Sequence, residues 1–255
     1  MKCSITYKDD YRLSYSEFGN LQGYPILIQH GLIASIEDYD LFESLVDLGV
    51  RLISIARPGY GESSPYLMRN IAEWGEIVSV LVEHLQLPQF DVLGMSSGAP
   101  YSYAIGHNFP DRVRDIFIFS GIPALYDENV AAHWPYELKK DAEISEMANL
   151  AHRLFFSSLS QQDLAKREIQ DSLQNNCFGP ALDFRIRCMD WGFKLSDVHQ
   201  QVIMQHSRLD EGFVTAEITS TLLPNCKFIV RESEGHFSQE LLSLFIKTEM
   251  SDFYN

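Results

Sequence analysis

Two adjacent serines in the stretch GMSSGAP combine a residue type and a spacing that suit nucleophilic catalysis. A serine at the tip of a sharp turn from a strand into a helix presents its hydroxyl to substrate, and its strained backbone requires small residues two positions before and after it. Gly94 and Gly98 meet this requirement for Ser96. Were Ser97 at the tip, Met95 would occupy one flanking position and would clash. The spacing therefore predicts Ser96 as a nucleophile.

A serine hydroxyl is a weak nucleophile at neutral pH, so a base must take its proton and a carboxylate must orient the base. His236 follows the last apolar segment, in ESEGHFS, and Asp210 follows the preceding one, in QHSRLD. If these segments are parallel strands, their carboxyl ends meet at one edge of a sheet. The chain order serine, aspartate, histidine is also the order that this turn motif predicts. We therefore expect Ser96, Asp210 and His236 to form a catalytic triad, with no metal ion required.

Three other acidic residues compete with Asp210 for its role. Glu211 is adjacent, but it is expected to begin the next helix, where an acidic side chain suits the helix dipole. Asp190 and Asp197 are expected to cap or solvate the end of a preceding helical segment. Asp210 is therefore the preferred acid.

Other polar residues near the predicted strand ends have structural interpretations. His206 lies inside a predicted strand and is expected to be a hydrogen-bonded structural histidine, and His30 is expected to shape its loop. Arg57 is expected to have a structural role in its own turn. His133 and His152 could touch substrate, although a surface position is preferred for both.

The turn QHGLIAS supplies a candidate for stabilising the negative oxygen of a tetrahedral intermediate. The backbone N–H of Leu32 is expected to point to the same place as the N–H of Ser97, which follows the nucleophile. Each such donor typically contributes about 2.7 to 4 kcal/mol to the chemical step. Leu32 and Ser97 are therefore the predicted oxyanion hole.

The elements around these residues alternate between apolar strands and helices. The first three of six short strand-like segments are too continuously apolar for strands with one wet face, so we expect a parallel sheet covered by helices. Helices are expected over 38–48, 70–87 and 211–223, and the N-terminal residues are expected to form an antiparallel hairpin. This order predicts an α/β fold with a doubly wound, mostly parallel sheet, whose ligand site lies beyond the strands' carboxyl ends. The six segments are PILIQHG, VRLISIARPG, FDVLGMS, RDIFIFSG, QVIMQHSRLD and KFIVRESEGH.

The alternation stops after residue 121, and a long stretch of helical pattern follows before strands return. We therefore expect residues 1–121 and 195–255 to form a core domain, and residues 122–194 to form an inserted helical cap or lid over the strand ends. Aromatic side chains of the cap could line a mostly apolar pocket or could only pack on the core. They include Trp134, Tyr136, Phe155 and Phe156.

Composition limits the partners of the chain. Its 255 residues carry a formal net charge of −15, which would repel nucleic acids and anionic membranes, so we expect a small-molecule substrate and neither of those partners. No apolar segment approaches the roughly 20 residues of a membrane span, and the N-terminus lacks a secretory signal pattern. The four cysteines lie far apart without metal-ligand spacing, as in a cytoplasmic protein with reduced thiols. A homodimer formed through an apolar cap surface is left open.

Together these motifs resemble the α/β-hydrolase fold superfamily, in its capped branch of esterases and aminopeptidases. The resemblance runs from about Tyr15 to Phe245 and implies a serine hydrolase with the triad described above. In similar proteins the turn RPGYGESS often begins with an aspartate, where this chain has Ala56. That position usually supports the loop, so the triad assignment is unaffected. The segments that carry the resemblance are HGLIAS, ARPGYGESS, GMSSGAP, DRV, WGFKLSDV and EGHFS.

The resemblance implies acyl transfer to water without an organic cofactor. A carboxylesterase for a small or medium apolar acyl group is the preferred interpretation. An aminopeptidase comes second, because acidic cap residues such as Asp127, Glu128, Glu137 and Glu143 could hold an α-amino group. Carbon–carbon bond cleavage beside a ketone, or perhydrolysis, would use the same triad. Outside enzymes, the alternative is a receptor that keeps the scaffold and binds a small molecule.

Overall fold

The computed structural model describes residues 1–8, 10–140, 142–232 and 235–254. Within these ranges eight strands form one sheet, in the spatial order β1-β2-β4-β3-β5-β6-β7-β8. β2 pairs antiparallel with β1 and with β4, and the other neighbouring strands pair parallel. The strands are Lys2–Tyr7 (β1), Tyr11–Gly19 (β2), Pro25–Gln29 (β3), Arg51–Ile55 (β4), Phe90–Met95 (β5), Val113–Phe119 (β6), Gln201–Ser207 (β7) and Cys226–Arg231 (β8).

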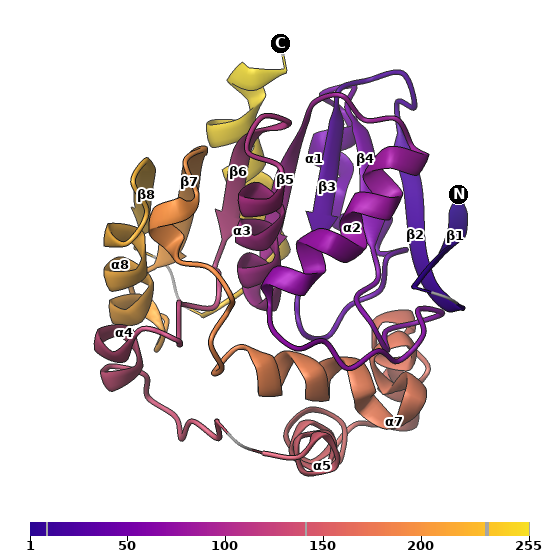
Figure 1. The fold of residues 1–255 in the computed structure, drawn as a ribbon, viewed down its shortest axis with the longest axis vertical. Coiled ribbons are helices and arrows are strands. Elements are labelled where there is room, and N and C mark those ends of the chain that lie inside the picture. Colours follow the sequence, from indigo (N-terminus) through magenta and orange to yellow (C-terminus); the bar gives the residue numbers. More distant parts are fainter. Residues whose placement is uncertain (9, 141, 233–234, 255) are drawn as a thin grey trace.

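The doubly wound arrangement is confirmed, because helices cover both faces of the sheet (Figure 1). Leu27 of β3 joins the apolar core under α2 and α3, whereas its neighbours Ile26 and Ile28 join the core under α1 and α9. This two-sided burial explains why the central strands are continuously apolar. The N-terminal hairpin is also confirmed, with Tyr7 of β1 opposite Tyr11 of β2.

The helices occupy the expected positions but are shorter than expected. The 38–48 segment is a 3₁₀ turn, Tyr39–Phe42, followed by α1, and the 70–87 helix is α2. Gly49 and Gln86 adopt left-handed backbone conformations, which stop the helical segments before them. The α-helices are Glu43–Val46 (α1), Ala72–His84 (α2), Ala99–Asn108 (α3), Glu128–Ala132 (α4), Ile144–Phe155 (α5), Gln161–Leu164 (α6), Arg167–Ile186 (α7), Phe213–Thr221 (α8) and Gln239–Phe245 (α9).

Helices α4 to α7 lie between β6 and β7, in the segment 122–194. Figure 1 shows α5 and α7 beyond the carboxyl ends of the central strands. α5 packs against α7, whereas α4 packs against α8. α7 is broken in its middle, because Asn175, Asn176 and Cys177 have left-handed φ angles of 52°, 58° and 59°. The helical pattern of the sequence predicts no such break.

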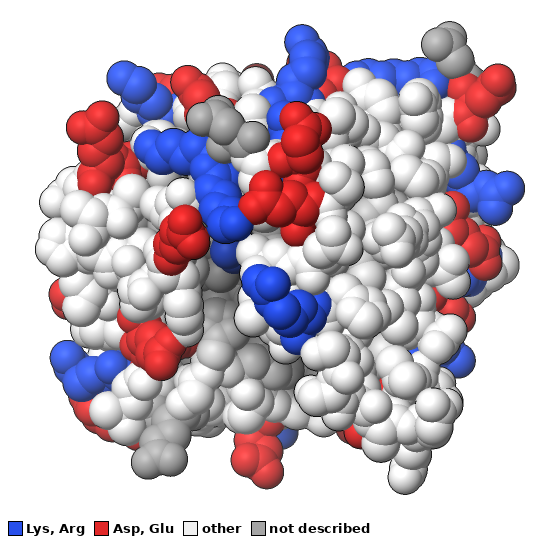
Figure 2. All heavy atoms as spheres, turned by 90° about the horizontal axis from the view of Figure 1, so that it is seen from below, with Lys and Arg blue, Asp and Glu red and all other residues white. Residues whose placement is uncertain are grey.

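The face that carries α5 and α7 shows acidic and basic side chains beside one another rather than a field of one sign (Figure 2). Ion pairs in this segment include Lys139 with Glu146 and Lys166 with Asp163. Across the described part of the chain, no helix combines the length and the apolar character that crossing a membrane requires.

Candidate active site

Ser96 stands at the corner between β5 and α3, with a left-handed φ of 48°. A methyl group at Gly98 would lie 2.1 Å from the carbonyl oxygen of Gln29, and one at Gly94 would lie 2.2 Å from Oγ of Ser102. Neither position has room for a side chain, so this corner requires glycine at both. The strain expected at the tip of the turn, and the reason for its glycine neighbours, are confirmed.

Three side chains from three strand ends form a continuous relay. Ser96 Oγ lies 2.7 Å from His236 Nε2, and His236 Nδ1 lies 2.6 Å from Asp210 Oδ2. The other carboxylate oxygen of Asp210 accepts the N–H of Gly212 at 2.7 Å. The serine follows β5, the aspartate lies in the turn after β7 and the histidine follows β8. The structure thus brings together the three residues that the sequence predicted.

The relay runs from a buried end to a solvated end. The side chain of Asp210 is 7% exposed and that of His236 is 41% exposed. Burial alone would raise the pKa of Asp210, but the neighbouring rings of His206 and His236 and the N–H of Gly212 outweigh it and hold that pKa well below its ordinary value. Asp210 is therefore ionised at physiological pH, as a group that orients an imidazole and stabilises its charged form must be.

His206 is buried in β7, as expected of a structural histidine. Its Nε2 lies 3.3 Å from Asp210 Oδ2, and this contact is among those that lower the pKa of Asp210. Oδ2 of Asp210 thus faces both His206 and His236, whereas Oδ1 accepts the N–H of Gly212. The expectation of a buried structural histidine is confirmed.

His206, Asp210 and His236 also form a group that could hold a metal ion, because their ligand atoms lie within 4.8 Å of one another. Ligand atoms around a tetrahedral zinc ion stand roughly 3.3 Å apart. The 2.6 Å contact between His236 and Asp210 is shorter than this, so an ion would have to break it. The geometry fits a chain of hydrogen-bonded side chains better than a metal centre.

The loop after β3 lies directly beside the nucleophile, since a methyl group at Gly31 would lie 3.9 Å from Cβ of Ser96. Among the residues that the structure describes, none accepts a hydrogen bond from the N–H of Leu32. Ser97 follows the nucleophile in the turn Ser96–Gly98 that leads into α3. Both predicted oxyanion donors therefore lie in segments that adjoin Ser96.

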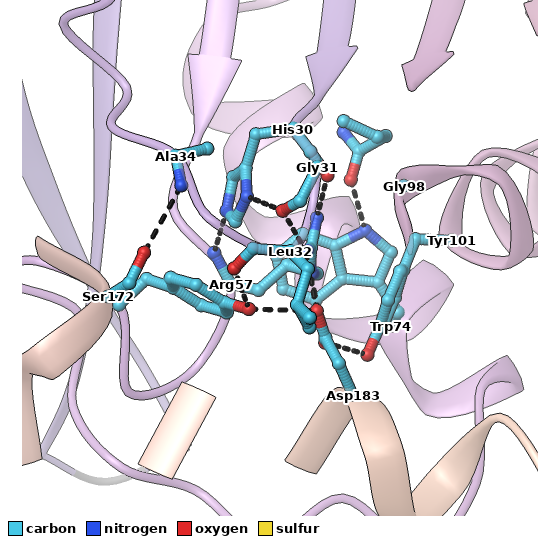
Figure 3. A network of polar contacts seen from close by, with 12 residues as sticks. His30, Gly31, Leu32, Ala34, Arg57, Trp74, Gly98, Tyr101, Ser172 and Asp183 are labelled. Atoms are coloured by element: carbon cyan, nitrogen blue, oxygen red, sulfur yellow. Dashed lines mark hydrogen bonds and ion pairs between the residues drawn. The ribbon is translucent and has the colours of Figure 1, made fainter. Parts of the chain in front are cut away.

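A buried network that sequence reasoning missed supports this loop (Figure 3). Arg57 Nη2 lies 2.6 Å from Oδ2 of Asp183 in α7, and the two side chains are 0% and 3% exposed. The hydroxyl groups of Tyr60 and Tyr101 also donate hydrogen bonds to the Asp183 carboxylate. The expectation that Arg57 acts only within its own turn is therefore too narrow. The available signal was an aspartate inside the apolar helical stretch GPALDFRI.

The acids that competed with Asp210 have partners other than His236. Asp190 and Asp197 each accept a backbone N–H from a residue two or three positions away. Glu211 contacts the hydroxyl of Tyr136 instead of a histidine. His133 is likewise local, with Nδ1 2.9 Å from the carbonyl oxygen one helical turn earlier.

Trp134 is an aromatic side chain of the inserted segment that lies close to the relay. Its Cζ3 would lie 3.8 Å from a methyl group at Gly212, whose N–H donates a hydrogen bond to Asp210. The ring of Tyr136 stands edge-on to that of Trp134, with centroids 5.4 Å apart. Phe156 is buried between α5 and α7 and is a packing residue.

Comparisons with known proteins agree with this geometry. The family model of the alpha/beta hydrolase fold matches residues 24–241. The uncharacterized hydrolase YcgS of Bacillus subtilis is 29% identical over 119 residues, which are 47% of this chain and 41% of that protein. The match therefore spans less than half of YcgS. A pimeloyl-[acyl-carrier protein] methyl ester esterase of Aromatoleum aromaticum is 24% identical over 231 residues, covering 83% of this chain and 90% of that protein.

Solved structures share the fold over nearly their whole length. The esterase EaEST from Exiguobacterium antarcticum has a TM-score of 0.71 at 18% identity, covering 97% of this chain and 100% of that chain. The enol-lactonase from Burkholderia xenovorans has a TM-score of 0.70 at 13% identity, covering 97% of this chain and 98% of that chain. Likeness at such identities concerns the fold alone. Because the family model matches most of its residues, this chain belongs to the α/β-hydrolase fold family.

Proposed function

We propose that the protein is a serine hydrolase that cleaves an ester, or a related acyl bond, of a small and largely apolar substrate. The observation that carries the proposal is the relay of Ser96, His236 and Asp210, joined by contacts of 2.7 and 2.6 Å at a strained corner of the backbone. Family membership and the esterases among its relatives support it.

In the proposed reaction Ser96 Oγ attacks the carbonyl carbon of the substrate while His236 Nε2 accepts the serine proton. The negative oxygen of the tetrahedral intermediate accepts hydrogen bonds from the N–H groups of Leu32 and Ser97. The leaving alcohol takes the proton from His236, and an acyl-enzyme remains. Water, deprotonated by His236, then releases the acid and restores the serine. Asp210 stays ionised and keeps the proton on Nδ1 of the imidazole.

Residues 122–194 act as a cap in this proposal, over a core made of residues 1–121 and 195–255. The apolar cluster between α5 and α7 extends to Leu32 and Ile33 of the loop beside the nucleophile. A substrate group that enters between cap and core at this point meets apolar side chains, which favours an apolar acyl group.

An aminopeptidase is less well supported. It would need acidic side chains directed at the site to hold the α-amino group of its substrate. Of the acidic residues of the inserted segment, Asp127 caps α4 by accepting the N–H groups of Asn129 and Val130. Glu143 stands at the start of α5, where an acidic side chain suits the helix dipole.

The test is to label the purified protein with a fluorophosphonate probe and map the modified peptide, in wild type and in Ser96→Ala. Label on Ser96 in the wild type, and none in the variant, is the expected result. A series of p-nitrophenyl esters from acetate to decanoate then measures the acyl preference. A folded protein that binds small molecules tightly but takes no label and turns over no ester would overturn the proposal in favour of a receptor.

A further inference from the structure

Three consecutive carbonyl groups of the loop beside Ser96 accept hydrogen bonds from side chains (Figure 3). Arg57 donates from Nη1 to the carbonyl of His30 at 2.6 Å and from Nη2 to the carbonyl of Gly31 at 2.8 Å. The hydroxyl of Tyr60 lies 2.8 Å from the carbonyl oxygen of Leu32. The carbonyl side of this loop is thus held by side chains from one neighbouring turn.

A carboxylate from the inserted segment holds the guanidinium that makes these contacts. Asp183 of α7 accepts Arg57 Nε at 3.2 Å on Oδ1 and Arg57 Nη2 at 2.6 Å on Oδ2. Burial alone would lower the pKa of Arg57, but Asp183 outweighs it, so the net shift is upward and the cation persists in a buried position. The planar fork of an arginine can serve a carboxylate and two carbonyl groups at once, which a lysine cannot.

The ring of His30 donates a second hydrogen bond to the carbonyl oxygen of Gly31. The backbone N–H of Arg57 lies 3.3 Å from His30 Nε2, which must therefore be the accepting nitrogen. The proton of the neutral ring is then on Nδ1, which lies 2.7 Å from the carbonyl oxygen of Gly31. Burial, together with the nearby Arg57 charge, lowers the pKa of His30 well below its ordinary value and keeps the ring neutral. Both lone pairs of the Gly31 oxygen are thus occupied.

The peptide unit that carries this carbonyl also carries the N–H of Leu32. Because a trans peptide is planar, its C=O and N–H point in opposite directions, and fixing one fixes the other. We propose that the buried Arg57–Asp183 pair positions the oxyanion loop: it holds the Gly31 carbonyl and so aims the Leu32 N–H at the oxygen that develops next to Ser96. Arg57 and Asp183 are positioning residues, and their role rests on the proposed serine hydrolase function.

In this arrangement α7 is a fixed part of the site and not a moving lid. Further contacts hold the helix against the same loop: Ser172 Oγ accepts the N–H of Ala34, and Asp171 accepts the hydroxyl of Ser35 and, at its carbonyl, the N–H of Gly61. A helix held by these hydrogen bonds forms part of the site.

A purely structural role is the competing explanation, and a matched control separates the two. Asp91 of β5 is also a fully buried aspartate, and it binds Arg114 and the hydroxyl of Tyr254, at the opposite end of β5 from Ser96. Asp183→Asn and Asp91→Asn therefore remove the same charge from similar surroundings. Only the first touches the network under the oxyanion loop.

The experiment compares kcat, KM and the Tm of these two variants with wild type on one p-nitrophenyl ester. Asp183→Asn is expected to lower kcat about 10- to 100-fold with KM within about twofold, because a misaimed donor loses part of the 10² to 10³ that one oxyanion donor contributes. Affinity for an alkyl boronic acid, which forms a tetrahedral adduct on the serine, should fall by a similar factor. Asp91→Asn should leave kcat within about twofold, whatever its effect on Tm.

A second pair of variants keeps the test decisive if Asp183→Asn folds poorly. Tyr60 and Tyr101 both contact the Asp183 carboxylate, but of the two only Tyr60 also contacts the carbonyl of Leu32. Tyr60→Phe is expected to lower kcat roughly threefold to tenfold, and Tyr101→Phe by less than Tyr60→Phe.

Equal kcat in wild type and a folded Asp183→Asn would overturn the inference, as would losses of kcat that follow Tm equally in all four variants. Either result leaves the proposed function standing as long as Ser96 of the wild type takes the fluorophosphonate label. A wild type without label or turnover would overturn the proposed function, and this inference with it.

Discussion

The two sides of Ser96 are built in opposite ways. On one side, the loop 30–32 is held by a network whose ion pair, Arg57 and Asp183, is almost wholly buried. On the other side, His236 is 41% exposed and follows Gly235, and no atom of the described residues lies within 4 Å of a methyl group added there. The difference matches the work that each side has in the proposed reaction. Donors that stabilise an oxyanion act best when fixed in advance, whereas a base that exchanges protons with water needs access to solvent.

The greatest loss of activity is expected on the side of Ser96 that carries His236 and Asp210, which we call the open side. Asp210→Asn should lower kcat by about 10⁴, because an amide at this position favours the wrong tautomer of the imidazole. The loss of stability should be far smaller, since the amide keeps the shape and one acceptor for the N–H of Gly212. Steady-state kinetics and urea unfolding of the same preparation check both parts.

Glu211→Gln is the control for that change, because Glu211 is adjacent and engages Tyr136 instead of the relay. It should keep wild-type turnover. Unchanged activity in Asp210→Asn, or a comparable loss in Glu211→Gln, would show that the wrong acid has been assigned.

The residues of the open side could be predicted from the sequence. The network that holds the loop 30–32, on what we call the closed side, could not. Ser96, Asp210 and His236 are each marked by residue type, by a neighbouring strand and by chain order, so local pattern and a parallel sheet suffice to bring them together. Asp183 carries no such mark. It lies in a helix and meets Arg57 across 126 positions of the chain, a contact that no local periodicity encodes.

The break in α7 shows the same limit. Residues 175–177 include neither glycine nor proline, and the two asparagines and Pro180 signal a break in the helix without fixing where it falls. Asparagine tolerates this conformation better than most residues, and Asn175 reaches from the break to the carbonyl of Gly59 at 3.4 Å. Tertiary packing, and not local propensity, therefore decides the shape of the inserted segment.

Two glycine substitutions probe the packing on the two sides of Ser96. Gly98→Ala would place its methyl group 2.1 Å from the carbonyl oxygen of Gln29, a backbone atom that cannot move without shifting β3 and the loop after it. We expect a loss of about 3 kcal/mol in the free energy of unfolding. Among the described residues an alanine methyl at Gly235 meets no atom, so Gly235→Ala is expected to cost only the strain of a left-handed alanine at φ 80°, about 1 kcal/mol. Urea unfolding measures both, and equal losses would contradict the contrast.

The smallest change in stability is expected at one carboxyl group of the closed side. Asp38, whose Oδ2 accepts the N–H of Ser35 at 2.8 Å, has its pKa raised to about 6, chiefly by burial. A folded-state pKa above the unfolded value near 4 means that its contribution to stability is complete below about pH 4 and is lost as pH rises through about 6. At pH 8 the buried charge therefore opposes folding, whereas an asparagine would keep the acceptor without the charge.

Asp38→Asn should accordingly raise the free energy of unfolding by about 1 kcal/mol at pH 8, and the gain should disappear at pH 4. The opposite sign is expected on the open side, where the lowered pKa of Asp210 makes its ionised form stabilising at neutral pH and lost only as pH falls through that lowered value. Asp47→Asn, at an exposed position nine residues further along the chain, is the control. A gain in Asp38→Asn that is the same at pH 4 and pH 8 would mean that burial does not disfavour the charge, and the closed side would then be more solvated than its contacts indicate.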